Sequence, residues 1–237
     1  MKMRFVGKKA LVTGAAGGIG RAIVEVLRKV GAEVATTDRA GNDFDGDLME
    51  ARFCDDLPVR VAECLSGLEL LINNAGIITR GKITEASDED LTRPLAVNVE
   101  APFRLCRAAI PIMADAGAGA IVNTASCWGV HSGPDHPIYI MSKAAVASLT
   151  QCLGRDHAHQ NIRVNAVCPN EVNTPMIRSG FELCGFDPDA AISELNASVP
   201  LGRIAEPEDI ADVVAFLPRM RRAICAARCL RSTVGNL

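Results

Sequence analysis

The chain has 237 residues, 49% hydrophobic and 22% charged, which is typical of one soluble domain with a sizeable core. It contains 25 Lys and Arg and 28 Asp and Glu, which gives a net charge of −3. This near-neutral net charge argues against a nucleic-acid-binding surface or a polybasic membrane anchor. No apolar run approaches the roughly 20 residues that span a bilayer, and no apolar segment follows the basic start, so neither a membrane span nor a secretory signal is expected. The nine cysteines include no Cys-x-x-Cys pair. They are expected to be free thiols in a cytoplasmic protein without a zinc site.

Short apolar runs alternate with segments of helical periodicity along most of the chain. Strands are expected over residues 9–12, 33–37, 68–73, 120–123 and 162–167. Helices are expected over residues 20–30, after Ser87, after Pro102, over 139–159 and over 206–217. The alternation predicts an α/β fold with one doubly wound parallel sheet covered by helices on both faces.

One connection in this pattern is unusually short. Asp47 follows Asp38 by only nine positions. A strand–helix–strand crossover needs a dozen or more residues. The helix after the second strand is therefore expected to be lost or reduced to a loop.

A glycine-rich segment, residues 13–20, lies where the first strand turns into a helix. Glycines there let the backbone approach a pyrophosphate, and the helix N-terminus offers it free N–H groups, although a tight turn alone has the same appearance. Asp38 favours the cofactor interpretation, because it ends the next strand, where a carboxylate can accept hydrogen bonds from an adenosine ribose. Its charge would repel a 2′-phosphate and favours NAD over NADP. The neighbouring Arg39 is the counterargument, since a guanidinium there can bind that phosphate.

Tyr139 and Lys143 are four residues apart on an expected helix and therefore share a face. An ammonium near the phenol lowers its pKa from about 10, as a general base for an alcohol proton requires. The pair alone also occurs by chance on solvated helix faces. Ser126 ends a strand 13 residues earlier, where a hydroxyl can hold a substrate oxygen, and Asn98 precedes the helix at Pro102.

Together these motifs resemble those of the short-chain dehydrogenase/reductase family, in its shorter form of roughly 250 residues, over about residues 5–217. They stand in the family's order and at its usual spacing. The resemblance implies one Rossmann-type domain over residues 1–217 that self-associates as a dimer or tetramer. The motifs are Thr13-Gly14-x-x-x-Gly18-x-Gly20, Asn73-Asn74-Ala75-Gly76, Asn98, Ser126, Tyr139-x-x-x-Lys143 and Asn165-x-Val167-x-Pro169.

The resemblance also implies a role for each motif residue. Tyr139 would be the catalytic acid/base, and Ser126 would orient the substrate carbonyl or alcohol. Lys143 would bind the nicotinamide ribose and lower the pKa of Tyr139, while Asn98 would support a water chain that carries the proton out. The residues expected to bind the cofactor are Gly14, Gly18, Ile19, Gly20, Asp38, Asp47, Asn74, Gly76, Tyr139, Lys143 and Thr174.

The expected function is hydride transfer between NAD(H) and a secondary alcohol or the matching ketone. The first expectation for the substrate is a small polar polyol, sugar derivative or hydroxy acid, because residues 126–136 and 170–200 mix polar groups with few aromatics. A 3-oxoacyl reductase, which would more often use NADPH, is one alternative. A dinucleotide-binding protein without turnover and an inactive product of a damaged reading frame are the others.

The end of the chain departs from the family. Residues 218–237 hold five arginines and two cysteines without an acid, whereas residues 1–217 carry 20 basic against 28 acidic residues. Permitted codons for residues 218–236 can be chosen so that the frame starting at the third base begins Ser-Asp and ends Val-Asn-Gly-Gly-stop, as the family does. Residues 218–237 are therefore expected to be an aberrant basic tail from a frameshift, with the last strand lost.

Overall fold

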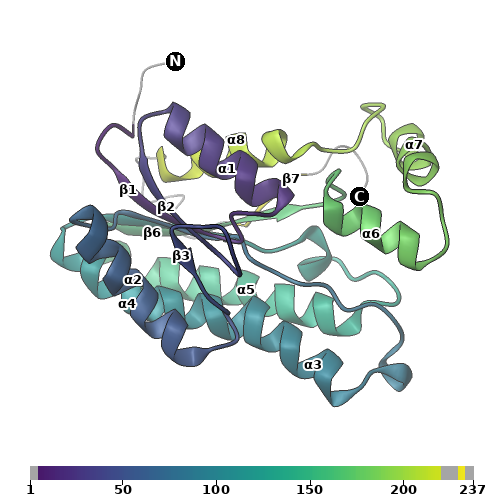
Figure 1. The fold of residues 1–237 in the computed structure, drawn as a ribbon, viewed down its shortest axis with the longest axis horizontal. Helices are drawn as coiled ribbons and strands as arrows, with labels where there is room; N and C mark the ends of the chain where they lie inside the picture. The colour runs from purple at the N-terminus through teal and green to yellow at the C-terminus, as the bar shows by residue number, and fades with distance from the viewer. Residues whose placement is uncertain (1–4, 220–228, 233–237) are drawn as a thin grey trace.

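Seven parallel strands form one sheet in the computed structural model, which describes residues 5–219 and 229–232 (Figure 1). The strands are β1 (Lys9–Thr13), β2 (Glu33–Asp38), β3 (Phe44–Asp45), β4 (Leu70–Asn73), β5 (Gly119–Thr124), β6 (Ile162–Pro169) and β7 (Cys229–Ser232). Their order across the sheet is β3-β2-β1-β4-β5-β6-β7. The direction of winding reverses between β1 and β4, and doubly wound sheets bind ligands beyond the carboxyl ends of the strands at that reversal.

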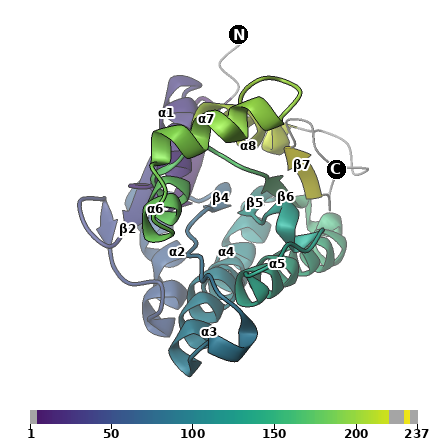
Figure 2. The same cartoon turned by 90° about the vertical axis from the view of Figure 1, so that its right-hand side faces the viewer.

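Helices cover both faces of the sheet. The α-helices are α1 (Gly18–Lys29), α2 (Ala51–Leu65), α3 (Asp88–Leu95), α4 (Ala101–Asp115), α5 (Pro137–Asp156), α6 (Pro175–Leu183), α7 (Pro188–Ser198) and α8 (Pro207–Phe216). Short helical turns are η1 (Ile83–Glu85), η2 (Ala96–Glu100, a π-helix), η3 (Cys127–Gly129), η4 (Ala158–Gln160) and η5 (Leu217–Arg219). α1 and α8 pack together on one face, and α2, α4 and α5 cover the other, with α6 and α7 at one end of the sheet (Figures 1 and 2). No helix within the described ranges is long and apolar enough to cross a membrane.

The strands are buried on both sides because helices cover both faces. Along β1, Ala10 and Val12 belong to the apolar cluster beneath α1 and α8, whereas Leu11 belongs to the cluster beneath α2 and α4. Leu71 of β4, paired with Leu11, faces the same way as Leu11. This double burial explains why the strands consist of continuous apolar runs without polar alternation.

The expected start of α3 is confirmed as a capping box. The Asp90 N–H donates to the Ser87 hydroxyl over 3.1 Å, and the Ser87 N–H donates to the Asp90 carboxylate over 3.0 Å. This exchange satisfies two N–H groups at the helix start. The same exchange stands before α8, between Glu206 and Asp209.

The connection after β2 is a loop without a helix, as its length predicts. The Asp43 carboxylate holds this loop against the sheet, accepting hydrogen bonds from the Thr36 backbone over 2.9 Å and from the Thr36 hydroxyl over 2.8 Å. The loop leads to β3, which pairs only Phe44 and Asp45 with β2. The shortened crossover leaves Asp38 and Asp47 at the same end of the sheet.

The expectation that the last strand is lost is wrong for residues 229–232. These residues form β7, which pairs with β6 from Ala166–Cys229 to Pro169–Ser232. The composition of the tail misled the sequence analysis, because an edge strand offers unpaired backbone N–H and C=O groups to any segment that can extend beside it. Residues 220–228 and 233–237 of the tail lie outside the described residues. α2, α6 and α7 are helices that the sequence analysis did not predict.

Candidate active site

A cavity of about 880 Å³ opens at the carboxyl end of the sheet, between the strand ends and α6. It extends from the glycine-rich turn after β1 to the start of α5. All but one of the predicted site residues line it, and Asn98 lies buried behind its wall. The lining residues that the sequence predicted are Gly14, Gly18, Ile19, Gly20, Asp38, Asp47, Asn74, Gly76, Ser126, Tyr139, Lys143 and Thr174.

The glycine-rich turn has no room for side chains at two positions. Gly14 has a φ of +64°, and a Cβ built on it would lie 2.8 Å from the Cα of Ala75. A Cβ on Gly20 would overlap the carbonyl oxygen of Gly14. α1 begins after Gly17 with neither a capping side chain nor an acidic residue in its first turn. Its first N–H groups are therefore available to an anion such as a pyrophosphate.

Two carboxylates lie at this end of the cavity. Asp38 ends β2 and accepts hydrogen bonds from the backbone N–H groups of Ala16 over 3.1 Å and of Arg39 over 2.8 Å. Asp47 accepts one from the Met49 N–H over 2.9 Å. These bonds orient both carboxylates, and the bond from Ala16 ties Asp38 directly to the glycine-rich turn.

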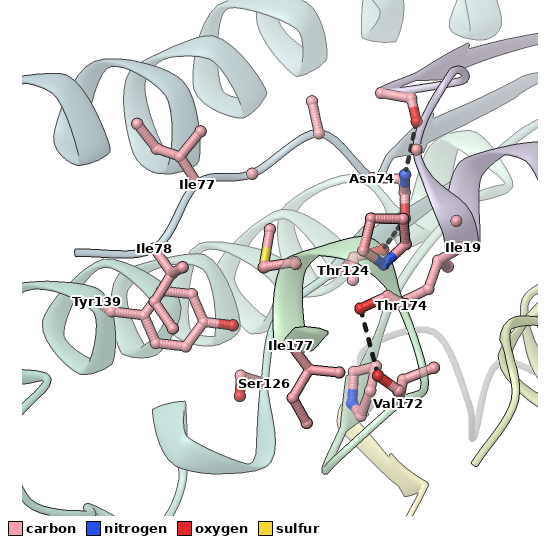
Figure 3. A pocket seen from close by; sticks show the side chains of 18 of the residues that line it. Ile19, Asn74, Ile77, Ile78, Thr124, Ser126, Tyr139, Val172, Thr174 and Ile177 are labelled. Carbon is pink, nitrogen blue, oxygen red and sulfur yellow. Dashed lines mark hydrogen bonds between the residues drawn. The ribbon is translucent and has the colours of Figure 1, made fainter. Parts of the chain in front are cut away.

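Asn74 links the ends of three strands beneath the cavity (Figure 3). Its amide nitrogen donates to the carbonyl oxygens of Thr13 over 3.2 Å and Gly14 over 3.3 Å. Its amide oxygen accepts from the Thr124 hydroxyl over 3.4 Å. The side chain therefore joins the end of β1 to that of β5 and fixes the glycine-rich turn to the sheet.

Tyr139 and Ser126 lie side by side in the cavity (Figure 3). Burial raises the pKa of the Tyr139 phenol above its usual value, while a hydrogen bond with Ser126 acts in the opposite direction. Close packing brings the two residues together, because a Cβ on Gly129 of η3 would lie 2.7 Å from the backbone of Lys143 in α5. A glycine at this position lets the segment after β5 approach α5.

Lys143 is buried beneath the Tyr139 ring. Its Nζ donates to the Thr124 carbonyl oxygen over 2.8 Å and lies 5.8 Å from the centre of the Tyr139 ring. Burial lowers the pKa of Lys143 to about 8, with a smaller opposing effect from Cys168. The groups that lower the pKa of Tyr139 in this structure are Ser126 and Arg80. An effect of Lys143 on the phenol therefore stays a prediction.

Asn98 holds two segments behind the cavity. It lies in the π-helix η2, a local irregularity that is frequent at functional sites. Its side chain pairs with both backbone polar groups of Ile77, each over 2.9 Å, and donates to the Ser142 hydroxyl over 2.9 Å. Ser142 in turn donates to the Tyr139 carbonyl oxygen over 2.7 Å. Asn98 therefore positions the segment after β4 against the start of α5.

Comparison with known proteins assigns the chain to a family. A family profile of short-chain dehydrogenases, described as enoyl-(acyl carrier protein) reductase, matches residues 14–227. The chain belongs to the short-chain dehydrogenase/reductase family. Its members are oxidoreductases, and this chain is an NAD(P)-dependent enzyme that interconverts alcohols and carbonyl compounds.

Relatives of this short-chain dehydrogenase/reductase act on different molecules. A 3-oxoacyl-(acyl-carrier-protein) reductase of Thermotoga maritima is 31% identical over 91% of this chain and 92% of its own. The aldohexose dehydrogenase of Thermoplasma acidophilum, in ligand-free form, superposes with a TM-score of 0.91 at 31% identity, covering 98% of this chain and 94% of its own. The L-sorbose reductase of Gluconobacter frateurii, complexed with NADPH and L-sorbose, superposes with a TM-score of 0.90 at 28% identity, covering 99% and 98%.

Further side chains line the cavity outside the motifs. Trp128, His136 and Glu171 line the cavity, and the Trp128 and His136 rings meet edge to face with their centres 4.7 Å apart. Cys127 donates to the side chain of Asn170, which follows β6, over 2.9 Å. Among the described residues, no group of three or more metal-ligating side chains is present.

Sequence reasoning missed Arg80 and the wall that α6 and α7 contribute. Arg80 follows the Asn-Asn-Ala-Gly motif but belongs to no motif itself, and only the fold brings it beside α6. The start of α7 could have been found, because Asp187 precedes Pro188 and caps the helix by accepting from the Ala190 N–H over 2.8 Å. The apolar residues that these two helices place in the cavity include Met176, Ile177, Phe181 and Leu195.

Proposed function

We propose that this enzyme oxidises a secondary alcohol, or reduces the matching ketone, by hydride transfer with NAD(H). The substrate we propose is a small polyol, sugar derivative or hydroxy acid. The observation that carries the proposal is the single cavity that Asp38 lines at one end and Ser126 and Tyr139 line at the other.

The residues at the first end fit a dinucleotide. In the glycine-rich turn, Gly14 and Gly20 lack the Cβ that would collide with neighbouring backbone atoms. The start of α1 supplies free N–H groups for the pyrophosphate. Asp38 and Asp47 would receive the adenosine half, and Asn74, Gly76 and Thr174 would line the path towards nicotinamide. When bound, the nicotinamide supplies the hydride acceptor or donor.

The residues at the second end fit transfer of the proton of the substrate hydroxyl. In the direction of oxidation, the Tyr139 phenolate would take the proton from the substrate hydroxyl while the Ser126 hydroxyl holds that oxygen. Lys143 would bind the nicotinamide ribose and stabilise the phenolate by its charge. Asn98 holds the Ile77 backbone and Ser142 in place, and from there it would support the water chain that removes the proton.

The preference for NAD rests on Asp38. A fixed carboxylate at the end of β2 accepts hydrogen bonds from a 2′-hydroxyl and repels a 2′-phosphate. Two observations oppose it: Arg39 also lines the cavity, and the related L-sorbose reductase was found with NADPH. The preference is therefore the first quantity to measure.

The names of the neighbours support a sugar or polyol, since aldohexose dehydrogenase and L-sorbose reductase both act on such molecules. A 3-oxoacyl reductase is the second candidate. It is favoured by the relative of that name and by the apolar side chains that α6 and α7 contribute. We further propose that the enzyme works in the cytoplasm and that it is a dimer or tetramer. The exposure of the apolar side chains of Phe103 on α4 and Met141 on α5 supports self-association.

A panel of polyols, sugars and hydroxy acids, each offered with NAD and with NADP, tests the proposal through the absorbance of the reduced cofactor. A parallel assay supplies a 3-oxoacyl thioester with NADH or NADPH. We expect oxidation of a member of the first panel with NAD, and none by Tyr139→Phe. Turnover of the thioester alone would establish the second candidate. Tight cofactor binding without any turnover would indicate a binding protein.

A further inference from the structure

We propose that Arg80 forms a carboxylate-binding subsite next to the reacting hydroxyl, so that the substrate is a hydroxy acid. The inference rests on the proposed function, because it takes Ser126 and Tyr139 to hold the hydroxyl that reacts. It narrows the proposed substrates to those that carry both a secondary alcohol and a carboxylate.

Arg80 belongs to the segment after β4, and its side chain contacts α6. It lines the cavity, and one of its terminal nitrogens donates to the Met176 carbonyl oxygen over 3.1 Å. Gly180 makes room for it, since a Cβ there would overlap the guanidinium. The Arg80 side chain is therefore packed against α6 and hydrogen-bonded to it.

The charge of Arg80 is unpaired within the described part of the chain. No described carboxylate lies within 4.0 Å of its guanidinium, and the contact with Met176 is its one hydrogen bond to a described residue. A guanidinium has five N–H donors in a planar fork that matches a carboxylate. Most of its binding capacity therefore remains for a ligand.

The charge also lies close to the reacting end of the cavity. Burial raises the pKa of Tyr139, and the Arg80 charge is among the effects that oppose this increase. Arg80 and Tyr139 therefore interact electrostatically across the same cavity. A ligand whose hydroxyl lies at Tyr139 can place a carboxylate against Arg80.

The other charges at this end are differently arranged. Arg93 also lines the cavity, but its guanidinium pairs with Glu89 over 3.6 Å, and its side chain is 45% exposed. Glu171 lines the cavity and would repel a carboxylate. Lys143 also lines this end without a described counter-ion, but it is buried, and its ammonium is bonded to the Thr124 carbonyl oxygen. Among the described lining residues of this end, Arg80 is thus the partly buried cation without a described counter-ion.

The rest of the wall favours a carboxylate on a small carbon skeleton. Ile78 and Ile177 face the cavity beside Tyr139 and Ser126 (Figure 3). Such apolar neighbours strengthen an ion pair by excluding water from it. One guanidinium matches the two oxygens of a carboxylate, whereas a phosphate dianion would leave an oxygen and much of its charge unmatched. A neutral polyol would leave the guanidinium without a counter-ion.

Binding to the NAD⁺ complex of the Tyr139→Phe enzyme, in which no oxidation of the probe is expected, tests the subsite without turnover; the variants below are made in this background. The probes are matched pairs, 3-hydroxybutyrate with its methyl ester and gluconate with gluconamide, and glycerol 3-phosphate as a second anion. Titration calorimetry, or the fluorescence of the single Trp128 in the cavity wall, gives each Kd. We expect the acid of at least one pair to bind at least about tenfold more tightly than its neutral partner and than the phosphate.

Variants separate recognition from a structural role. Arg80→Gln should weaken binding of the acid on the order of 10- to 100-fold and of its neutral partner by less than about threefold, while Arg80→Lys should restore part of the difference. Gly180→Ala, which displaces the guanidinium without loss of helix propensity, should act in the same direction. Arg93→Gln is the matched control and should change the ratio between acid and neutral partner by less than about threefold. Glu171→Gln should strengthen binding of the acid.

Several results would overturn the subsite. These are equal binding of acid and neutral partner in both pairs, an Arg80→Gln effect of the same size on both members of a pair, or tighter binding of glycerol 3-phosphate than of either acid. The proposed function fails separately: if acids bind through Arg80 but no panel alcohol is oxidised with NAD or NADP, the subsite stands and the activity does not. If neutral polyols are oxidised as efficiently as acids, the activity stands and the subsite does not.

Discussion

The ammonium of Lys143 is bonded to the Thr124 carbonyl oxygen at the end of β5, over 2.8 Å. The lysine thereby ties α5 to the sheet directly beneath Tyr139. A buried ammonium loses the hydration of its charge, and one hydrogen bond to a neutral carbonyl replaces little of it. The site therefore holds a charge that costs stability.

The first prediction concerns that cost. The pKa of Lys143 is about 8 in the folded protein against 10.5 for a free lysine, so the unfolded chain binds more protons between these pH values. The free energy of unfolding should therefore rise with pH between about 8 and 10.5, by up to about 3 kcal/mol from this group. Lys143→Met should abolish turnover yet be more stable at pH 7, and this gain should shrink as the pH approaches 10.

Urea unfolding at pH 7 and at pH 10 checks this prediction. Cys54 and Cys106 also contribute, because burial raises the pKa of each to about 12, so stability is lost as the pH rises above 9. Their contribution is common to both proteins and cancels in the difference between Lys143→Met and the unmodified chain. A difference in unfolding free energy that is the same at both pH values would contradict the prediction.

The second prediction concerns the phenol. Tyr139→Phe should lower kcat at least about 100-fold and leave the affinity for NADH nearly unchanged, because the hydroxyl acts on the substrate proton. Ser126→Ala should also lower kcat, whereas Lys143→Ala should weaken cofactor binding as well. Fluorescence titration gives the affinity, and steady-state assays give kcat. A Tyr139→Phe enzyme that keeps most of its rate would disprove the proton-transfer role.

The third prediction concerns the choice of cofactor. Because the Asp38 carboxylate would meet the ribose hydroxyls, NADH should bind more tightly than NADPH. Asp38→Ala should weaken NADH and tighten NADPH by removing the repulsion. Energy transfer from Trp128 to the reduced nicotinamide gives both Kd values. If the unmodified protein binds NADPH as tightly as NADH, specificity belongs to Arg39, and Arg39→Ala should then weaken NADPH selectively.

The fourth prediction concerns the basic tail and Arg163 of β6. Arg163 donates to the Pro218 carbonyl oxygen over 3.0 Å, its Nε is buried without a hydrogen-bond partner among the described residues, and burial lowers its pKa. The other reading frame places an aspartate within two positions of Pro218, where it can pair with this guanidinium. Restoring that frame should raise the Tm and shift a dimer towards a tetramer.

Thermal unfolding and light scattering of the two proteins check the fourth prediction. In the protein with the restored frame, replacing that aspartate with asparagine should lower the Tm. This decrease in Tm should be absent when Arg163 is also replaced by Gln. Because the structure contains β7, the behaviour of this strand can also contradict the prediction. If the chain as written is already a stable tetramer whose β7 amides resist hydrogen exchange as strongly as those of β6, the reading-frame hypothesis fails.

Much of the fold could be predicted because local chemistry specifies it. The continuous apolar runs of β1, β4 and β5 require a sheet covered on both faces, and the spacing of nine from Asp38 to Asp47 excludes a crossover helix. Capping residues fixed the starts of α3 and α8 within a few positions. These signals depend only on residues that are neighbours in the sequence, so they can be recognised without knowledge of the tertiary structure.

The sequence by itself determined the glycine-rich turn and the grouping of Ser126, Tyr139 and Lys143, because a helix places Tyr139 and Lys143 on one face and parallel strands bring their ends to one edge. Only the tertiary structure decided what surrounds them. The Thr124 carbonyl beneath Lys143, Arg80 against Gly180, and β7 beside β6 all join segments far apart in the chain. Such contacts form through packing and backbone pairing that carry no local periodicity, and two of the three use backbone atoms, which are the same at every position whatever the side chain.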